Sequence, residues 1–303
     1  MGKRIKRIGI GAFALVLLAL ILVFIASTVR WTRDYENLDA PVDAIAIPDS
    51  EAAVSRGEHI ATTHYCAYCH GDNLAGSFLV DEAALAIIPA PNLTAGAGGV
   101  GAANEDEDWI RAIRHGVGHD DRGLIGMPSR VWHQLSDEDL GALIAYLKTI
   151  PPVDNELPER RIGPLFRLML ALGQAPPPES SLIAHGTSRP PTPEPGVTTE
   201  YGEYLARSCT ACHGPDMAGG TTRTLDGELV TALNLTPGGE LAGWTEADFI
   251  TALRTGITPG GRRLSDEMPW TYVGQMTDDE LKAVWLYLQS LPAREQGLER
   301  TDL

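Results

Sequence analysis

The chain has 303 residues, of which 44% are hydrophobic and 21% are charged, and its formal net charge is −16. This hydrophobic fraction is ordinary for a globular protein, and the acidic balance excludes nucleic acid as a partner because phosphates attract basic surfaces. Residues 1–30 hold five of the 24 basic side chains and no acidic ones, so the remainder has 19 basic against 40 acidic side chains. Such acidity either steers a basic partner toward the protein or only keeps the protein soluble.

An apolar segment near the start of the chain predicts a membrane anchor. "IGIGAFALVLLALILVFIA" (8–26) is 19 residues without a charge, close to the roughly 20 needed to span a bilayer as a helix. It follows four basic residues, Lys3, Arg4, Lys6 and Arg7. By the positive-inside rule, 1–7 is a cytoplasmic tail, 8–29 is a transmembrane anchor, and the rest lies on the periplasmic or extracellular side. A signal peptide cleaved at Ala26-Ser27-Thr28 is the alternative, but the apolar run is long for one.

All four cysteines of the chain lie in two short motifs of the same form, "HYCAYCHGD" (64–72) and "RSCTACHGP" (207–215). A zinc site would need further ligands, yet no other cysteine exists and no histidine follows His213. A redox dithiol would sit beside a βαβ pattern and would not need a histidine directly after its second cysteine. Neither of these alternatives uses the complete motif.

Covalent attachment of haem uses every residue of the two motifs. Cysteines three apart on a helix face the same way, so each pair can reach the two vinyl groups of one porphyrin, and the following histidine points at the iron. The attachment residues are Cys66, Cys69 and His70 in the first motif, and Cys209, Cys212 and His213 in the second. The sequence therefore predicts two covalently bound haem c groups.

The two halves of the chain align downstream of these motifs, and the alignment predicts the second axial ligands. Segments 126–152 and 267–293 align without a gap, which brings Met127 onto Met268, each followed by proline. Elimination supports Met268. Met217 follows His213 too closely to reach the opposite face of the haem ring, and Met276 matches Leu135, a core position. In the first half, three histidines compete with the methionine, and the register of the repeat favours Met127. These competitors are His115, His119 and His133.

The rest of each half predicts helices and no sheet. Segments 136–148 and 277–289 begin with an N-cap residue and acidic side chains, carry one apolar stripe and stop before proline. Further helices are expected to lead into each haem motif and to lie midway between each motif and its methionine. These helices start near residues 51 and 200 and span roughly 105–115 and 245–255. No sustained alternation of polar and apolar residues indicates strands.

A Pro-rich segment, 153–198, separates the halves and is expected to act as a semi-rigid spacer. Within it, "RRIGPLFRLMLALG" (160–173) combines an apolar run with three arginines. This stretch either lies on the membrane surface or packs between the two haem domains.

The motifs, together with "PNLT", "GMPS" and "DEDLGALIAYLKTIPP" and their counterparts "LNLTP", "EMPW" and "DDELKAVWLYLQSLP", resemble class I cytochrome c domains. They are similar to the haem modules of membrane-bound periplasmic dehydrogenase cytochrome subunits, although those subunits typically carry three haems. The resemblance covers 51–152 and 199–295, and it implies an all-α fold of two tandem cytochrome c domains joined by a Pro-rich linker after an N-terminal transmembrane helix. In such domains a proline carbonyl near the haem usually orients the ligand histidine. Pro89 or Pro91 suits this role in the first half, whereas the second half has no proline at that place.

Two arginines in matching register are candidates to hold haem propionates, because a planar guanidinium suits a carboxylate. They are Arg114 in "RHGV" and Arg254 in "RTGI". The alternative is that both side chains simply face water, as most arginines do. Trp109, Asn92 and Asn234 are candidate donors to the same groups.

Histidine and methionine on each iron leave no site for substrate, so the resemblance and the ligands predict a carrier of single electrons and not an enzyme. Its expected partners are a dehydrogenase, a quinol-oxidising complex or a terminal oxidase in the respiratory chain. Two alternatives stay open, a dihaem peroxidase with one exchangeable ligand and a haem subunit fixed on a dehydrogenase complex. The sequence predicts no oligomeric state.

Overall fold

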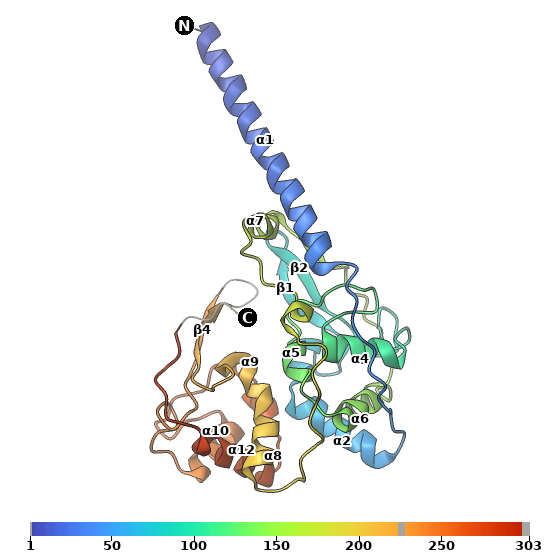
Figure 1. The fold of residues 1–303 in the computed structure, drawn as a ribbon, viewed down its shortest axis with the longest axis vertical. Coiled ribbons are helices and arrows are strands. Elements are labelled where there is room, and N and C mark those ends of the chain that lie inside the picture. Colours follow the sequence, from blue (N-terminus) through green and yellow to red (C-terminus); the bar gives the residue numbers. More distant parts are fainter. Residues whose placement is uncertain (1, 224–227, 299–303) are drawn as a thin grey trace.

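The computed structural model describes residues 2–223 and 228–298, and it is mostly helical with two small sheets. One long helix, α1 (Gly2–Tyr35), projects from two helical lobes that lie side by side (Figure 1). Its apolar residues between 10 and 26 are almost all exposed, and its length and composition suffice to cross a membrane. Met1, the first residue of the predicted cytoplasmic tail 1–7, lies outside the described residues.

Each lobe contains the helices that the sequence predicts. The first domain has α2 (Glu51–Thr63), α3 (Cys66–His70), α4 (Asp106–His115), α5 (Ser129–Trp132) and α6 (Asp137–Leu147). The second has α8 (Thr199–Ala206), η2 (Arg207–Cys209), α9 (Thr210–His213), α10 (Glu246–Thr255), α11 (Trp270–Val273) and α12 (Asp278–Ser290). The expected N-caps are present, because the hydroxyls of Ser136 and Thr277 accept hydrogen bonds from the third residue of the helix that each precedes.

The first and last helices of each domain cross at a glycine. A Cβ atom on Gly57 of α2 would lie 2.0 Å from the carbonyl oxygen of Ala142 in α6. The same atom on Gly202 of α8 would lie 1.9 Å from the carbonyl oxygen of Ala283 in α12. Only a residue without a side chain allows these helices to pack so closely. The contacts of α2 with α6 and of α8 with α12 join the first and last helices of each domain.

Two small antiparallel sheets contradict the purely helical prediction. In the first domain, β1 (Ser77–Glu82) pairs with β2 (Ala86–Ala90), and β2 pairs with β3 (Arg161–Ile162) from the segment between the domains. In the second, β4 (Gly220–Arg223) pairs with β5 (Leu229–Ala232). All the strands are short, and the two hairpins lie in the loops after the haem motifs, where hairpin pairing satisfies backbone groups without needing a long alternating pattern.

The segment 153–198 differs from a plain spacer because it lies over the first domain. It contains β3, the helix α7 (Pro164–Leu172) and the 3₁₀ helix η1 (Glu179–Leu182). Phe166 and Leu170 of α7 are buried in a cluster with Tyr35 of α1 and Ile88 of β2. Helix α7 therefore packs beside α1 and not between the two domains (Figure 1).

The two domains share a continuous hydrophobic core and two matching polar contacts. The hydroxyl of Tyr204 donates to Oδ2 of Asp139 at 2.6 Å, and Nε2 of His59 lies 2.9 Å from both carboxylate oxygens of Glu280. His59 and Tyr204 occupy matching positions of the two halves, as do Asp139 and Glu280. The interface therefore has an approximate two-fold symmetry, as expected when two copies of one domain type pack face to face.

Candidate functional site

The first haem motif forms α3, a single helical turn that brings Cys66 and Cys69 onto one side. The ring of His70 is buried, and its Nδ1 donates to the carbonyl oxygen of Pro91 at 2.8 Å. This bond leaves Nε2 of His70 free of a proton and available to a metal. Burial lowers the pKa of His70, which keeps the ring in the neutral form that a metal requires. Of the two prolines that the sequence offers for this contact, the structure therefore uses Pro91.

The second motif repeats this geometry without a proline. Nδ1 of His213 donates to the carbonyl oxygen of Leu233 at 2.7 Å. Leu233 and Pro91 each precede the asparagine of an "NLT" sequence, so the same place in the loop supplies the acceptor in both domains. Any residue can provide a backbone carbonyl, which is why the sequence carries no signal for this contact.

The cysteines lie in surroundings that do not suit a redox dithiol. Burial raises the pKa of Cys66 to about 12 and the pKa values of Cys69 and Cys209 to about 11. A reactive dithiol needs the opposite shift, because the thiolate is the attacking species. Among the described residues, no group of three or more His, Cys, Asp and Glu side chains is placed to hold a metal ion. The attachment of the four cysteines to haem stays a prediction.

A largely apolar cavity opens beside the second motif, and it brings the predicted ligands together. His213 and Met268 line the same cavity with Cys209 and Cys212. The wall of this cavity contains Leu235, Leu241, Trp244, Phe249, Leu253, Met276, Leu281 and Leu288. In the first domain, Met127 packs against the core cluster that also contacts Cys66. These residues fit a flat apolar group bound covalently at one edge.

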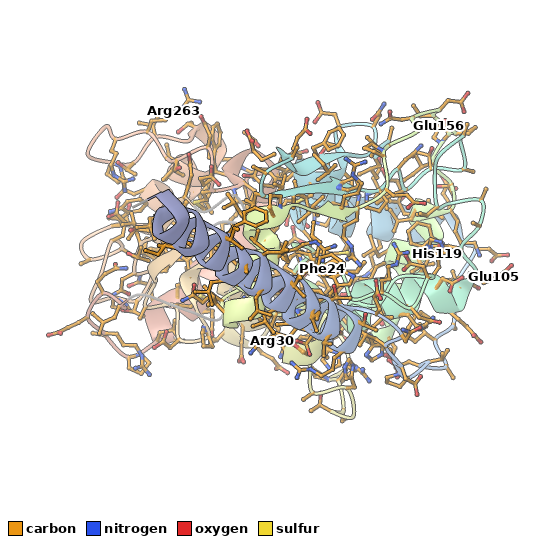
Figure 2. The ribbon with its side chains drawn as sticks, turned by 90° about the horizontal axis from the view of Figure 1, so that it is seen from above. Phe24, Arg30, Glu105, His119, Glu156 and Arg263 are labelled. Atoms are coloured by element: carbon orange, nitrogen blue, oxygen red, sulfur yellow. The ribbon has the colours of Figure 1, made fainter. Side chains whose placement is uncertain are left out.

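The other methionines and the competing histidines have different surroundings. Met217 and Met276 are each 1% exposed and belong to the core, as the alignment predicts for Met276. His115 is fully buried, with Nδ1 2.9 Å from Nδ1 of His185 and Nε2 3.2 Å from Asp43. The ring nitrogens of His133 contact the carbonyl of Arg114 and the hydroxyl of Thr187, while His119 is exposed at the rim of the first domain (Figure 2).

The two arginines in matching register connect helices. Arg114 is fully buried, and its Nη1 contacts Asp137 at 2.7 Å and Asp43 at 3.2 Å. Arg254 is partly exposed and contacts Asp278 at 2.8 Å. Asp137 and Asp278 are the first residues of α6 and α12, so each arginine joins the middle helix of its domain to the last. For Arg114, the alternative that it faces water is wrong.

The two asparagines also have a role that the sequence did not reveal. Nδ2 of Asn92 donates to the carbonyl of Val153 at 2.8 Å, and Nδ2 of Asn234 donates to the carbonyl of Arg294 at 2.7 Å. Both amides therefore tie the loop after the haem motif to the chain that leaves the last helix. Their contact with propionates stays a prediction.

Among the buried side-chain donors that lack a hydrogen-bond partner in the part of the chain that the structure describes, two belong to the predicted haem contacts. They are Nε1 of Trp109, whose side chain is 2% exposed, and Nε of Arg114. An unpaired buried donor costs about 1–3 kcal/mol, so a bound carboxylate would relieve it. This observation agrees with a haem propionate near these side chains.

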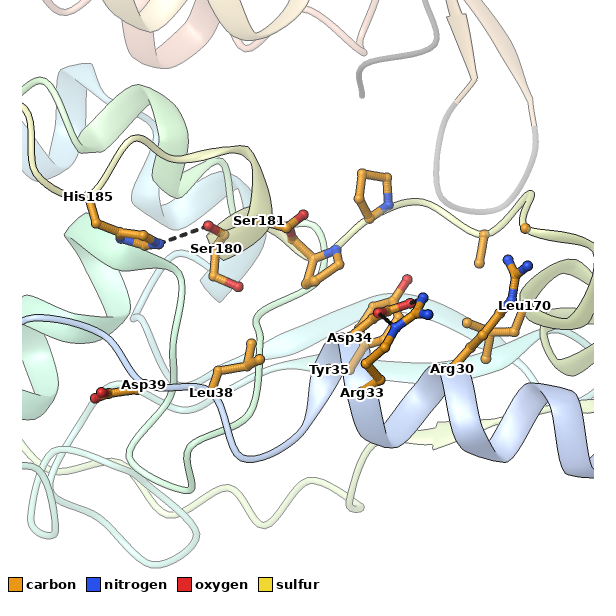
Figure 3. A pocket seen from close by; sticks show the side chains of 14 residues that line it. Arg30, Arg33, Asp34, Tyr35, Leu38, Asp39, Leu170, Ser180, Ser181 and His185 are labelled. Atoms are coloured by element: carbon orange, nitrogen blue, oxygen red, sulfur yellow. Dashed lines mark hydrogen bonds and ion pairs between the residues drawn. The ribbon is translucent and has the colours of Figure 1, made fainter.

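A second pocket lies away from the haem cavity, where α1 meets the first domain (Figure 3). Arg30, Arg33 and Tyr35 of α1 line one side, and Ser180 and His185 line the other. Polar groups thus surround the end of the apolar helix, at the depth where a membrane surface would lie if α1 crossed a bilayer.

Each of the two domains matches a family model. Residues 52–147 match the family described as "Cytochrome C oxidase, cbb3-type, subunit III", and residues 200–292 match the family described as "Cytochrome c".

Curated relatives include cytochrome subunits of dehydrogenases. The chain is 27% identical to the fructose dehydrogenase cytochrome subunit of Gluconobacter japonicus, over 81% of this chain and 54% of the relative. It is 29% identical to the cytochrome c subunit of the quinone alcohol dehydrogenase of Gluconacetobacter polyoxogenes, over 81% of this chain and 57% of the relative. The chain therefore spans little more than half the length of these subunits. A protein described as "Diheme cytochrome c-type", from Cereibacter sphaeroides, is 26% identical over 92% of this chain and 97% of the relative.

Proposed function

Since the chain is a dihaem c-type cytochrome, we propose that it carries single electrons on the outer face of a bacterial membrane, from a dehydrogenase or quinol-oxidising complex to a terminal acceptor. The observation that carries this proposal is the placement of His213 and Met268 in one apolar cavity with both attachment cysteines. Covalent haem, when bound, would supply a one-electron iron couple, and His213 and Met268 would both bind that iron, which would leave no position for substrate.

The side chains of each site would control that couple in two ways. The carbonyls of Pro91 and Leu233 fix the orientation of His70 and His213 through Nδ1, which also makes each ring a stronger ligand. Apolar walls exclude water and, together with methionine ligation, raise the reduction potential. Fixed ligands also mean that little rearrangement accompanies each electron.

The first domain supports Met127 as its second ligand because two of the competing histidines are held by other contacts and the third, His119, is exposed. Both ring nitrogens of His115 and of His133 contact protein groups, so neither ring has a nitrogen to spare for iron without breaking those contacts. A peroxidase would need an iron that is open or that sheds its ligand.

The junction of α1 with the first domain supports a retained anchor over a cleaved signal peptide. The helix continues without a break through Ala26 to Tyr35, and Ser27 is fully buried. The guanidinium of Arg167 in α7 lies 5.0 Å from the ring of Phe24. A peptidase would have to reach a packed helix at this place, so we infer that α1 stays and holds the haem domains at the membrane. The mass of the mature chain tests this inference, and a chain that begins after residue 26 would contradict it.

Helix α7 supports the membrane-surface alternative for 160–173. Leu165, Leu168 and Leu172 are exposed at helical spacing, beside the point where α1 leaves the first domain. An amphipathic helix with arginines nearby lies readily in the headgroup region. Hydrogen exchange of α7 tests this contact, because its amides should exchange more slowly in lipid nanodiscs than in detergent, whereas those of α10 should not differ.

The relatives support a dehydrogenase as the donor, because two of them are named as cytochrome subunits of fructose and alcohol dehydrogenases. We infer a membrane-bound dehydrogenase as the electron donor of this chain. Purification from native membranes should bring a dehydrogenase subunit with it, and recovery of the cytochrome alone at low and high salt would argue for a free carrier.

Carbon monoxide binding tests the carrier function directly. The reduced protein should pass electrons to another cytochrome or an oxidase and should bind carbon monoxide poorly at both haems. Met268→Ala is the positive control, because it opens one iron and should bind the gas. Stoichiometric binding to the unaltered protein, with peroxide turnover to match, would replace the carrier by a peroxidase.

A further inference from the structure

Tyr65 of the first haem motif reaches into the haem cavity of the second domain. This residue directly precedes Cys66, and its side chain lines the cavity formed by Cys209, Cys212 and His213. Its hydroxyl donates to the carbonyl oxygen of Ser208 at 3.0 Å. Ser208 directly precedes Cys209, so one side chain connects the backbone beside the first attachment cysteine of each domain.

The backbone at Tyr65 is shaped for this position. Its φ of 50° and ψ of 37° lie in the left-handed region, which is unfavourable for a bulky residue. Residues with such a strained backbone cluster at functional sites. The second domain has no counterpart, because nine residues lead from Gly57 to Cys66 and only seven from Gly202 to Cys209. The two additional residues of the first domain make the turn that carries Tyr65 to its neighbour.

A second contact joins the same parts of the two domains. The ring of Tyr68, which lies between the two cysteines of the first motif, meets the ring of Tyr272 edge-on with centroids 6.4 Å apart. Tyr272 belongs to α11, the short helix that follows Met268. The first motif therefore faces both the attachment side and the methionine side of the second cavity.

From these contacts we propose that Tyr65 is the bridge through which electrons pass between the two haem sites. The proposal rests on the proposed function, since it concerns transfer inside a dihaem carrier. The path runs from the Cys66 backbone through the Tyr65 ring and its hydrogen bond to Ser208 and Cys209. One electron leaves a ferrous site, a ferric site gains it, and no proton moves.

The phenol acts as a medium and is not itself oxidised. Tyr65 donates its proton to a backbone carbonyl, which cannot take that proton away. Burial, the largest influence, raises the pKa of Tyr65 well above its ordinary value, so the ring stays neutral. Tyr65 therefore supplies neutral intervening bonds between the two sites and is not a redox centre itself.

The test is the rate of electron equilibration between the haems of the full chain in detergent, after rapid reduction by a pulse of one-electron reductant. Tyr65→Leu removes the ring and should slow the concentration-independent phase several-fold. Tyr65→Phe keeps the ring and loses only the hydrogen bond, so its rate should fall less. Tyr204→Phe is the matched control, because it also removes a phenol hydrogen bond between the domains but lies outside the haem cavity.

Two further measurements separate a bridge from a structural role. Both reduction potentials and the magnetic coupling between the two ferric irons should be unchanged in Tyr65→Phe, which shows that the domains keep their distance. An unaltered rate of electron equilibration in Tyr65→Leu overturns the proposal. Equal slowing in Tyr204→Phe also overturns it, and so does a change in magnetic coupling that accounts for the slowing. Normal exchange with external partners in these variants leaves the carrier function intact even if the bridge fails.

Discussion

Nε2 of His59 in the first domain lies 2.9 Å from both carboxylate oxygens of Glu280 in the second. Glu280 also caps its own helix, because it accepts a hydrogen bond from the backbone of Thr277. The hydrogen bond with Glu280 raises the pKa of His59, although burial and the nearby Arg56 oppose it. Burial would raise the pKa of Glu280, but the bonds from His59 and Thr277 lower it. The contact between His59 and Glu280 is thus one link between the two domains whose strength depends on pH.

This pair predicts that the domain interface weakens in mild alkali. His59 has a raised pKa in the folded chain, so its contribution is complete below its usual value of 6.5 and is lost as pH rises through the folded value. The side chain is about one-third exposed, so the effect should stay under about 1 kcal/mol. The thermal midpoint of the unaltered chain should exceed that of His59→Gln more at about pH 5.5 than at about pH 8.

The difference between the two chains isolates this pair from the other histidines. Burial lowers the pKa values of His64 and His115 to about 4, so their effect has the opposite sign and appears in acid. The effect of His64 and His115 is the same in both chains, so it cancels when the thermal midpoint of His59→Gln is subtracted from that of the unaltered chain at each pH. An equal difference in midpoint at both pH values would contradict the prediction.

The methionine ligands predict a spectroscopic loss in two variants. Methionine-ligated haem iron has a weak red absorption band, and each of the two haems contributes part of it. Met127→Ala and Met268→Ala should each remove the contribution of one haem and should lower the reduction potential of that haem. Covalent attachment should survive, because the cysteines are untouched. Met276→Leu is the control, since Met276 lines the same cavity but matches Leu135 in the first domain. A full band in either alanine variant would mean that another side chain binds the iron.

Close helix crossing predicts that Gly57 and Gly202 do not tolerate a methyl group. Gly57→Ala and Gly202→Ala force a carbon to about 2 Å from a carbonyl oxygen, so each should cost about 1–3 kcal/mol through displaced helices. Gly186→Ala is the control, because no atom lies within 4 Å of the added carbon. Thermal unfolding of the three variants checks the prediction, and equal midpoints would contradict it.

Local patterns predicted most of the helices and both attachment motifs. Ser136 and Thr277 marked helix starts that the structure confirms, because an N-cap acts through bonds to its own neighbours. The contacts that the sequence did not reveal are long-range and use backbone atoms, as the carbonyl of Leu233 does for His213. Strand pairing of Ile162 with Ala86 and packing of α7 beside α1 were also missed, because each joins segments that lie far apart in the sequence. A spacer with no strong pattern of its own took its structure from the domain that it covers.

The unequal burial of two matching arginines predicts unequal losses of stability. Arg114 is fully buried and donates hydrogen bonds to Asp43, Asp137 and the carbonyl of Leu135, whereas the side chains of Asp43 and Asp137 are 22% and 63% exposed. Arg114→Gln should therefore cost about 1–3 kcal/mol, chiefly by removing the donor to the Leu135 carbonyl. The side chain of Arg254 is 35% exposed, and its partner Asp278 is 71% exposed, so Arg254→Gln should cost about 0.2–1 kcal/mol. Chemical denaturation of each variant, followed at its own haem, measures the difference, and similar losses would contradict this explanation. If the unpaired Nε of Arg114 meets a propionate, this variant should also shift the potential of the first haem, whereas a structural arginine would leave it unchanged.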